Sequence, residues 1–255
     1  MNTANIKEIE YLKSKLSEIT YDANRFNILI GDSGKFIFGI MTPNKSKETP
    51  LSKFMKFRTL YDTLKDLDFK IKISFEKGIE YAYSESVSNN FSFVNYPTED
   101  EILAYYFIEN ALFRTSSLWD ILAQLYCLTY DVPININEIH YKQIFNPRLS
   151  YSKKFKKDAR IISDYLRESD FTNTDKEWTG NHKYANKCRN KMTHRNSPNV
   201  LALSDYDLNI KQHPTYMLKR IIEDYNTVSK YIDKILTEIE KTSIENFKKL
   251  KPVTK

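Results

Sequence analysis

This chain is poor in the residues on which several large classes of protein depend. It has five glycines and two cysteines among 255 residues. The phosphate-cradling loops of P-loop and Rossmann proteins need several glycines close together, so the scarcity of glycine argues against both kinds of nucleotide site. A single pair of cysteines, Cys127 and Cys188, does not suggest a disulfide framework in a chain of this length. Both lie within helical patterns, and we expect them to be small core residues.

Long apolar segments are absent as well. No run approaches the ~18 apolar residues that a membrane-spanning helix requires. Residues 1–9 include acidic and polar side chains where a signal peptide would have an apolar centre. We therefore expect a cytoplasmic protein with no membrane partner.

Acidic residues are missing from one stretch of the chain. Between Trp178 and Ser204 there is no Asp or Glu, although the whole chain carries a net charge of only +6. A local excess of positive charge attracts polyanions such as RNA. The cations of this stretch are Lys183, Lys187, Arg189, Lys191 and Arg195.

The same stretch contains the sequence Arg-Asn-Lys-Met-Thr-His at residues 189–194. Arg189 can grip phosphate oxygens with a rigid fork of donors, and His194 can exchange a proton near neutral pH. Such a pattern arises by chance in roughly one comparable chain in ten. We expect the Asn190 amide to hydrogen-bond near the site and to orient Arg189, His194 or a phosphate oxygen.

Hydrophobic periodicity predicts a mainly α fold in two parts. Residues 1–96 are expected to form a smaller α+β extension of unknown role, and residues 97–255 a helical bundle. Thr98 and Glu101 have the spacing of a capping box, which predicts a helix from there to about residue 130. The other elements expected are helices over 6–19, 54–67, 153–167, 180–194 and 214–250, a hairpin over 26–30 and 36–41, a strand over 70–75 and a linker over 84–97.

An Arg, a polar residue, three further residues and a His at the end of the third bundle helix resemble the HEPN superfamily. The similarity covers about residues 97–250. The resemblance implies a four-helix bundle and a metal-independent endoribonuclease without cofactors, with Arg189, Asn190 and His194 as catalytic residues. It also implies a role as a toxin or antiphage effector, for which an antitoxin is a conceivable partner. Other branches of the superfamily lack the motif and serve as non-catalytic nucleotide-binding or assembly modules.

The chemistry of RNA cleavage suits these residue types. The 2′-hydroxyl is the nucleophile, so the reaction needs a base, an acid and a cation at the phosphate. One His and one Arg are too few for all three roles, and five helical residues turn by ~500°, which leaves the two side chains ~140° apart. Either the helix ends between them, or they face a site shared across a dimer. We expect a homodimer with a composite active site, its interface supplied by the apolar stripes of the helices over 98–130 and 214–250.

Several residues have alternative interpretations. Arg114, Asp120 and their polar neighbours on the first bundle helix either form a solvated face or line the cleft, where Asp120 could orient His194. Lys187, Lys191 and Arg195 are candidates for binding RNA. Arg189 and His194 could instead form a cation pair that complements the C-terminal end of a helix. His182, Cys188 and His194 could be proposed as zinc ligands, but their spacing matches no established site, so we expect no metal.

The leading functional hypothesis is thus an RNA-cleaving enzyme. The alternatives are a non-catalytic module that binds nucleotides or a protein, and a purely structural helical protein.

Overall fold

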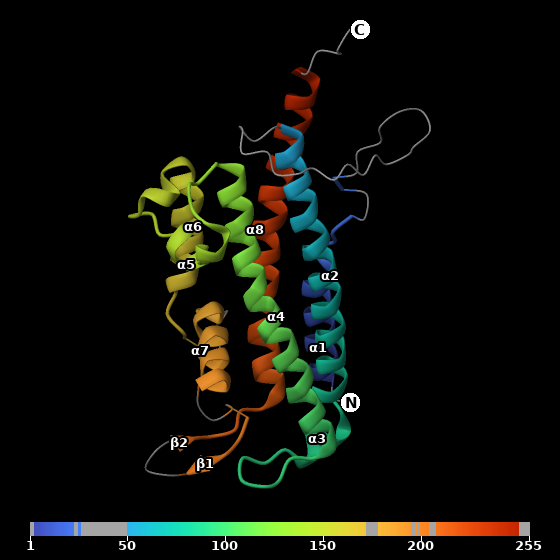
Figure 1. Ribbon diagram of the computed structural model, residues 1–255. Helices are drawn as coiled ribbons and strands as arrows, with labels where there is room; N and C mark the ends of the chain where they lie inside the picture. Colours follow the sequence, from blue (N-terminus) through green and yellow to red (C-terminus); the bar gives the residue numbers. More distant parts are fainter. Residues whose placement is uncertain are drawn as a thin grey trace.

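Helices make up most of the computed structural model, which describes residues 3–22, 25–26, 50–171, 178–194, 197, 199–203 and 208–249 (Figure 1). The expectation of a mainly α fold is confirmed. Two very short strands, β1 (Ala202–Leu203) and β2 (Leu208–Asn209), pair antiparallel. The helices are α1 (Thr3–Ser17), α2 (Pro50–Ala82), α3 (Glu85–Asn90), α4 (Glu99–Thr129), α5 (Tyr141–Ile144), α6 (Lys156–Arg167), α7 (Asn181–His194) and α8 (Pro214–Lys249), with 3-10 turns η1 (Ile136–Glu138) and η2 (Ser150–Phe155).

The three longest helices, α2, α4 and α8, run alongside one another and form the centre of the bundle (Figure 1). The most extensive contact between helices joins α2 to α4. Helix α1 packs on α8 and α2, whereas α6 and α7 lie on the opposite side of the bundle. The candidate site on α7 is therefore carried by α4 and α8 and lies away from α1 and α2.

One hydrophobic core joins the described helices before and after residue 96. Its buried side chains include Leu12 of α1, Phe75 of α2, Trp119 of α4 and Ile232 of α8. The ring of Phe75 lies 5.6 Å from the ring of Tyr225 in α8. The expected division at residue 96 thus falls between helices that share a core.

Helix α4 begins where its capping sequence predicts. The Thr98 hydroxyl accepts a hydrogen bond from the Glu101 backbone N–H at 3.2 Å. The first turn carries three acidic residues, which complement the positive end of the helix dipole. The helix ends at Thr129, and Asp131 follows with a positive φ of 48°.

Two expectations for the N-terminal part are wrong. Residues 70–75 are not a strand but part of α2, where Ile71 and Phe75 are buried one turn apart while Ile73 between them is 42% exposed. The apparent alternation was produced by apolar residues on opposite sides of a helix. The Ser-Asn run of the expected linker instead forms α3, because the Ser84 hydroxyl caps the Val87 N–H at 3.2 Å and the Val87 side chain is buried. The expected hairpin lies outside the described residues, except for Phe26.

The apolar stripe of α8 was expected to form a dimer interface, and this expectation is wrong. Its side chains are covered within the chain itself, since Leu218, Ile221 and Ile235 are each 0% exposed. Most of the apolar surface of α4 is buried in the same way. A dimer would have to use other surfaces, such as the outer side of α4, where Ile102, Tyr106 and Phe113 are exposed.

Candidate active site

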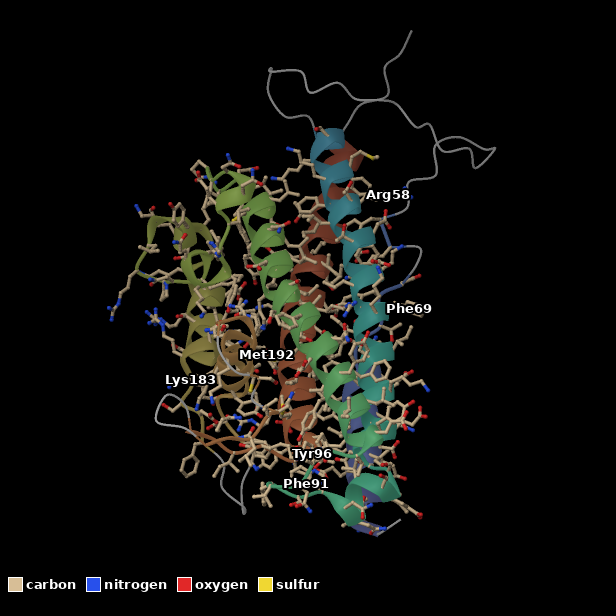
Figure 2. The ribbon with its side chains drawn as sticks, turned by 60° about the horizontal axis from the view of Figure 1, so that its bottom comes forward. Arg58, Phe69, Phe91, Tyr96, Lys183 and Met192 are labelled. Carbon is tan, nitrogen blue, oxygen red and sulfur yellow. The ribbon has the colours of Figure 1, made fainter. Side chains whose placement is uncertain are left out.

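Helix α7 presents two lysines to solvent and small and aromatic residues to the bundle. Lys183, Lys187 and Asn190 are exposed, whereas Tyr184 and Cys188 are buried. Figure 2 shows Lys183 and Met192 on this helix. The acid-free stretch therefore places a positively charged helix face at the surface.

A buried arginine of α8 fixes the point where α7 begins. Arg220 is 0% exposed, and its guanidinium donates to Asp170 Oδ1 and to the Thr179 carbonyl, both at 2.9 Å, and also to Asn181. Gly180 lies between Thr179 and Asn181 in the chain and has a φ of +72°. A Cβ at this position would lie 2.5 Å from the backbone of residues 169 and 170. This position requires glycine, and the Arg220 contacts hold the start of α7 against α8.

The arginine of the motif is held by its neighbour. Arg189 is half-buried, and its Nη2 donates to Asn190 Oδ1 at 3.2 Å. The guanidinium thus lies beside the side chain of Asn190 and does not cap a carbonyl of α7. The Arg189 carbonyl accepts a hydrogen bond from the Thr193 hydroxyl at 3.1 Å.

The histidine of the motif ends α7. The backbone of His194 closes the helix, whereas its side chain and the whole of Arg195 lie outside the described residues. The 3.6-residue period still separates Arg189 and His194 by ~140° around α7. The spatial relation of their side chains therefore stays a prediction.

Asp120 of α4 lies near Arg189. Burial raises the pKa of the Asp120 carboxyl, while a hydrogen bond from the backbone N–H of Tyr141 and the positive charges of His140 and Arg189 partly oppose that rise. Among the described residues, none bonds its buried Oδ1. Asp120 is half-buried, with one carboxylate oxygen shielded from solvent, and its place in the site stays a prediction.

The other residues that the sequence suggests as RNA contacts differ in whether their side chains already have protein partners. The Lys187 side chain is exposed, whereas Lys191 Nζ donates to Asn209 Oδ1 of β2 at 2.9 Å. Arg114 donates to the carbonyl and the side-chain oxygen of Asn110, on its own helix, at 3.1 and 2.9 Å. Lys187 therefore remains available to a polyanion, while Lys191 and Arg114 already have protein partners.

A buried polar network behind α7 was not predicted from the sequence. His182 Nε2 lies 3.1 Å from the Tyr141 hydroxyl, and its Nδ1 lies 3.4 Å from Asp224 Oδ1. Asp224 also accepts hydrogen bonds from Trp119 at 3.2 Å and from Tyr165 at 2.9 Å. Only the tertiary packing brings these residues together, from α4, α5, α6, α7 and α8. The network anchors α5 to α7 and α8.

Both cysteines are free and buried, as expected of core residues. Burial raises the pKa of each thiol, Cys127 and Cys188, to about 11, which keeps both protonated and unreactive at neutral pH. Among the residues that the structure describes, no group of three His, Cys, Asp or Glu is arranged as a metal site requires.

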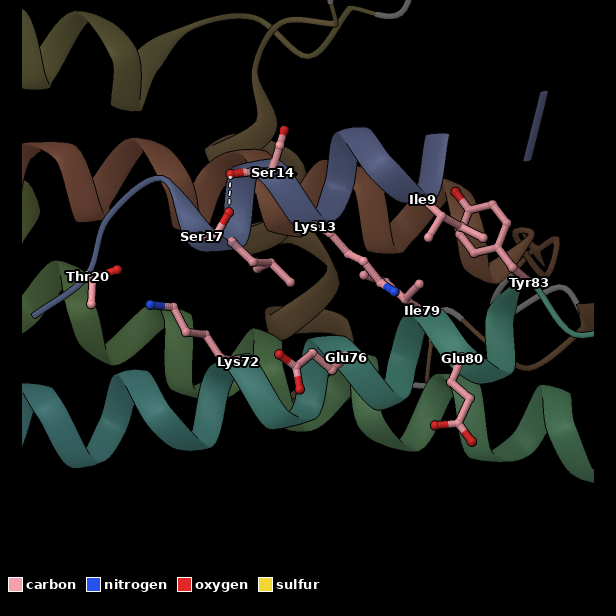
Figure 3. Close-up of a pocket in the computed structure, with 11 residues that line it drawn as sticks. Ile9, Lys13, Ser14, Ser17, Thr20, Lys72, Glu76, Ile79, Glu80 and Tyr83 are labelled. Carbon is pink, nitrogen blue, oxygen red and sulfur yellow. Dashed lines mark hydrogen bonds between the residues drawn. The ribbon is translucent and has the colours of Figure 1, made fainter. Parts of the chain in front are cut away.

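A separate hollow of about 920 Å³ lies between α1 and α2 (Figure 3). Its charged lining residues are Lys13, Lys72, Glu76 and Glu80, which balance in sign. Lys72 is already committed, because its Nζ lies 2.9 Å from both Asp68 Oδ2 and the Ile19 carbonyl. The lining therefore gives no preference for an anion, unlike the exposed face of α7.

Comparisons with protein families, with curated proteins and with solved structures gave no match to this chain. No helix in the described part of the chain is long and apolar enough to cross a membrane.

Proposed function

We propose that the protein is a metal-independent endoribonuclease of the HEPN type. It would cleave RNA by attack of the 2′-hydroxyl, leaving 2′,3′-cyclic phosphate and 5′-hydroxyl ends. One observation carries the proposal: Arg189 is held by Asn190 at the surface of a helix that has exposed lysines and no acidic residue. An accessible, oriented guanidinium on a cationic surface suits a phosphodiester.

Each motif residue has a role in this reaction. Arg189 binds the phosphate and stabilises the charge that develops on its oxygens. Asn190 orients the guanidinium, and His194 transfers a proton to or from the reacting oxygens. Exposed lysines, Lys187 among them, guide the RNA backbone. The substrate brings its own nucleophile, so no metal-bound hydroxide is needed.

The test is incubation of purified protein with RNA in excess EDTA, followed by analysis of the product ends. We expect cleavage in chelator, with 2′,3′-cyclic phosphate at each new 3′ end. Cleavage that disappears in EDTA and returns with a divalent ion would overturn the proposed mechanism. RNA binding without cleavage would favour the non-catalytic HEPN module, and neither binding nor cleavage would favour a structural role.

The biological setting is part of the same proposal. A ribonuclease of this kind would act as a toxin or antiphage effector, and an antitoxin would be the partner of a toxin. The homodimer expected from the chemistry also stays a proposal, on a surface other than the apolar stripe of α8.

A further inference from the structure

The hollow between α1 and α2 is open because α1 is attached mainly to α8 (Figure 3). The Tyr11 hydroxyl donates to the Glu223 carboxylate of α8 at 3.0 Å. The side-chain amide of Asn226, also on α8, donates to the Lys15 carbonyl at 2.9 Å. A space of about 920 Å³ remains between α1 and the C-terminal half of α2. Sites that bind small molecules have volumes of ~300–1,000 Å³, so the hollow is large enough for such a ligand.

The floor of the hollow is apolar. Leu16 of α1 and Ile79 of α2 line it and are buried, and Ile9 of α1 is half-buried. Figure 3 shows Ile9 beside the ring of Tyr83 at one end of the hollow. An apolar group bound on this floor would be removed from water, which favours binding.

Tyr83, directly after α2, brings a polar group to that end of the hollow. The residue is buried, and its hydroxyl oxygen has no hydrogen-bond partner among the described residues. Burial and, to a smaller extent, the charge of Glu8 raise the pKa of this phenol, so it stays a neutral donor. Glu8 is paired with Lys219, 3.7 Å away. A buried hydroxyl without a partner costs free energy, which a ligand that accepts its hydrogen bond would recover.

Two opposite charges at the hollow also lack partners. Lys72 and Glu80 are already paired with neighbours on α2. Lys13 of α1 and Glu76 of α2 are exposed, and within the part of the chain that the structure describes neither forms an ion pair or a hydrogen bond. Figure 3 shows Lys13 reaching from α1 towards α2. The hollow thus offers one cation and one anion, carried by different helices.

We infer that this hollow binds a small zwitterion with an apolar body, the chemistry of a free amino acid or a short peptide. The ligand carboxylate pairs with Lys13 and its ammonium group with Glu76. Its apolar body lies on Leu16 and Ile79, and the Tyr83 hydroxyl donates to one of its oxygens. Glu76 repels a simple anion and Lys13 repels a simple cation, so a ligand with both charges fits best. The site is separate from α7 and does not depend on the proposed ribonuclease function.

Calorimetric titration of the full-length protein tests the inference with two probes, L-phenylalanine and L-leucyl-L-phenylalanine, which distinguish a free amino acid from a peptide. We expect saturable binding of at least one probe with a Kd of about 1 mM or tighter. The N-acetylated form of that probe lacks the ammonium group, and its C-terminal amide lacks the carboxylate. Each should bind ~10-fold or more weakly, because each leaves one charge of the site unpaired.

Three variants locate the binding. Lys13→Gln and Glu76→Gln should each weaken binding ~10-fold or more and leave the melting temperature of the free protein unchanged, because neither side chain has a protein partner. Lys7→Gln is the matched control, since Lys7 is an exposed lysine of α1 that does not line the hollow. Tyr83→Phe should weaken binding without lowering the melting temperature of the free protein, because it removes only an unpaired hydroxyl.

No saturable binding of either probe would overturn the inference. Equal affinity for the probe and for its acetylated or amidated form would also overturn it, because the ligand would then not be recognised as a zwitterion. Undiminished affinity in both Lys13→Gln and Glu76→Gln would place the binding elsewhere on the protein. These outcomes leave the ribonuclease proposal untouched, since none of the described residues that line the hollow belongs to α7.

Discussion

The buried Arg220 provides the most quantitative test of how α7 is held. Replacement by Met keeps much of the volume and removes every donor. Asn181 and the Thr179 carbonyl would lose a charged donor, and Asp170 would lose its ion pair. Breaking a buried ion pair costs ~3–5 kcal/mol. Asp170 is 32% exposed and can recover water, so we place the loss at the lower end, about 3 kcal/mol.

Urea unfolding followed by circular dichroism measures this loss. The control is Lys70→Ala, which removes an exposed ion pair between Lys70 and Asp66, 2.6 Å apart on α2. That change should cost no more than ~0.5 kcal/mol. In an Asp170→Asn background the cost of Arg220→Met should become smaller, because the ion pair is already gone. A loss for Arg220→Met as small as that of the control would refute the role assigned to Arg220.

Three further predictions follow from the same region. Gly180→Ala should destabilise the fold by ~1–3 kcal/mol because of the positive φ, and further because the new Cβ would meet the backbone of residues 169 and 170. An unchanged melting temperature would contradict this prediction. Asn190→Ala should lower RNA cleavage about tenfold without changing the unfolding curve, since it removes one hydrogen bond to a charged group; equal cleavage would place Asn190 outside the site. Asp120→Asn should raise the melting temperature at pH 7. Burial raises the pKa of this carboxyl, so the folded state binds its proton more tightly than the unfolded chain does. The ionised carboxylate therefore lowers the stability of the folded state at any pH above the folded pKa. That gain should fade as the pH falls through the folded pKa, and a gain independent of pH would contradict the reasoning.

Local signals in the sequence were enough to predict most of the helices. The capping hydroxyl of Thr98 and the continuous apolar stripe of α8 both act within a few residues along the chain, and the structure has helices at both places. The alternation of apolar and polar residues over 70–75 predicted a strand where the structure has a helix. Ile71 and Ile73 are identical in type, but Ile71 faces the core and Ile73 faces solvent. Tertiary packing, which a short window of sequence does not contain, decided between helix and strand there.

The site could be predicted only in part, for a similar reason. Arg189 and Asn190 are neighbours in the chain, so the motif alone suggested their contact. His182 and Asp224 are distant in sequence and come together only because α7 packs against α8. Nothing in the local pattern around residue 182 marks it as a buried histidine.

The most direct test of the central claim is the initial rate of RNA cleavage in excess EDTA for the wild type, Arg189→Ala and Arg189→Lys at equal protein concentration. Lys keeps the positive charge and loses the two-pronged donor geometry. We predict that Arg189→Ala abolishes cleavage and that Arg189→Lys restores only a small fraction of it, while the circular dichroism of both variants matches the wild type. Wild-type cleavage by folded Arg189→Ala would contradict the account, because the phosphate would then be bound elsewhere.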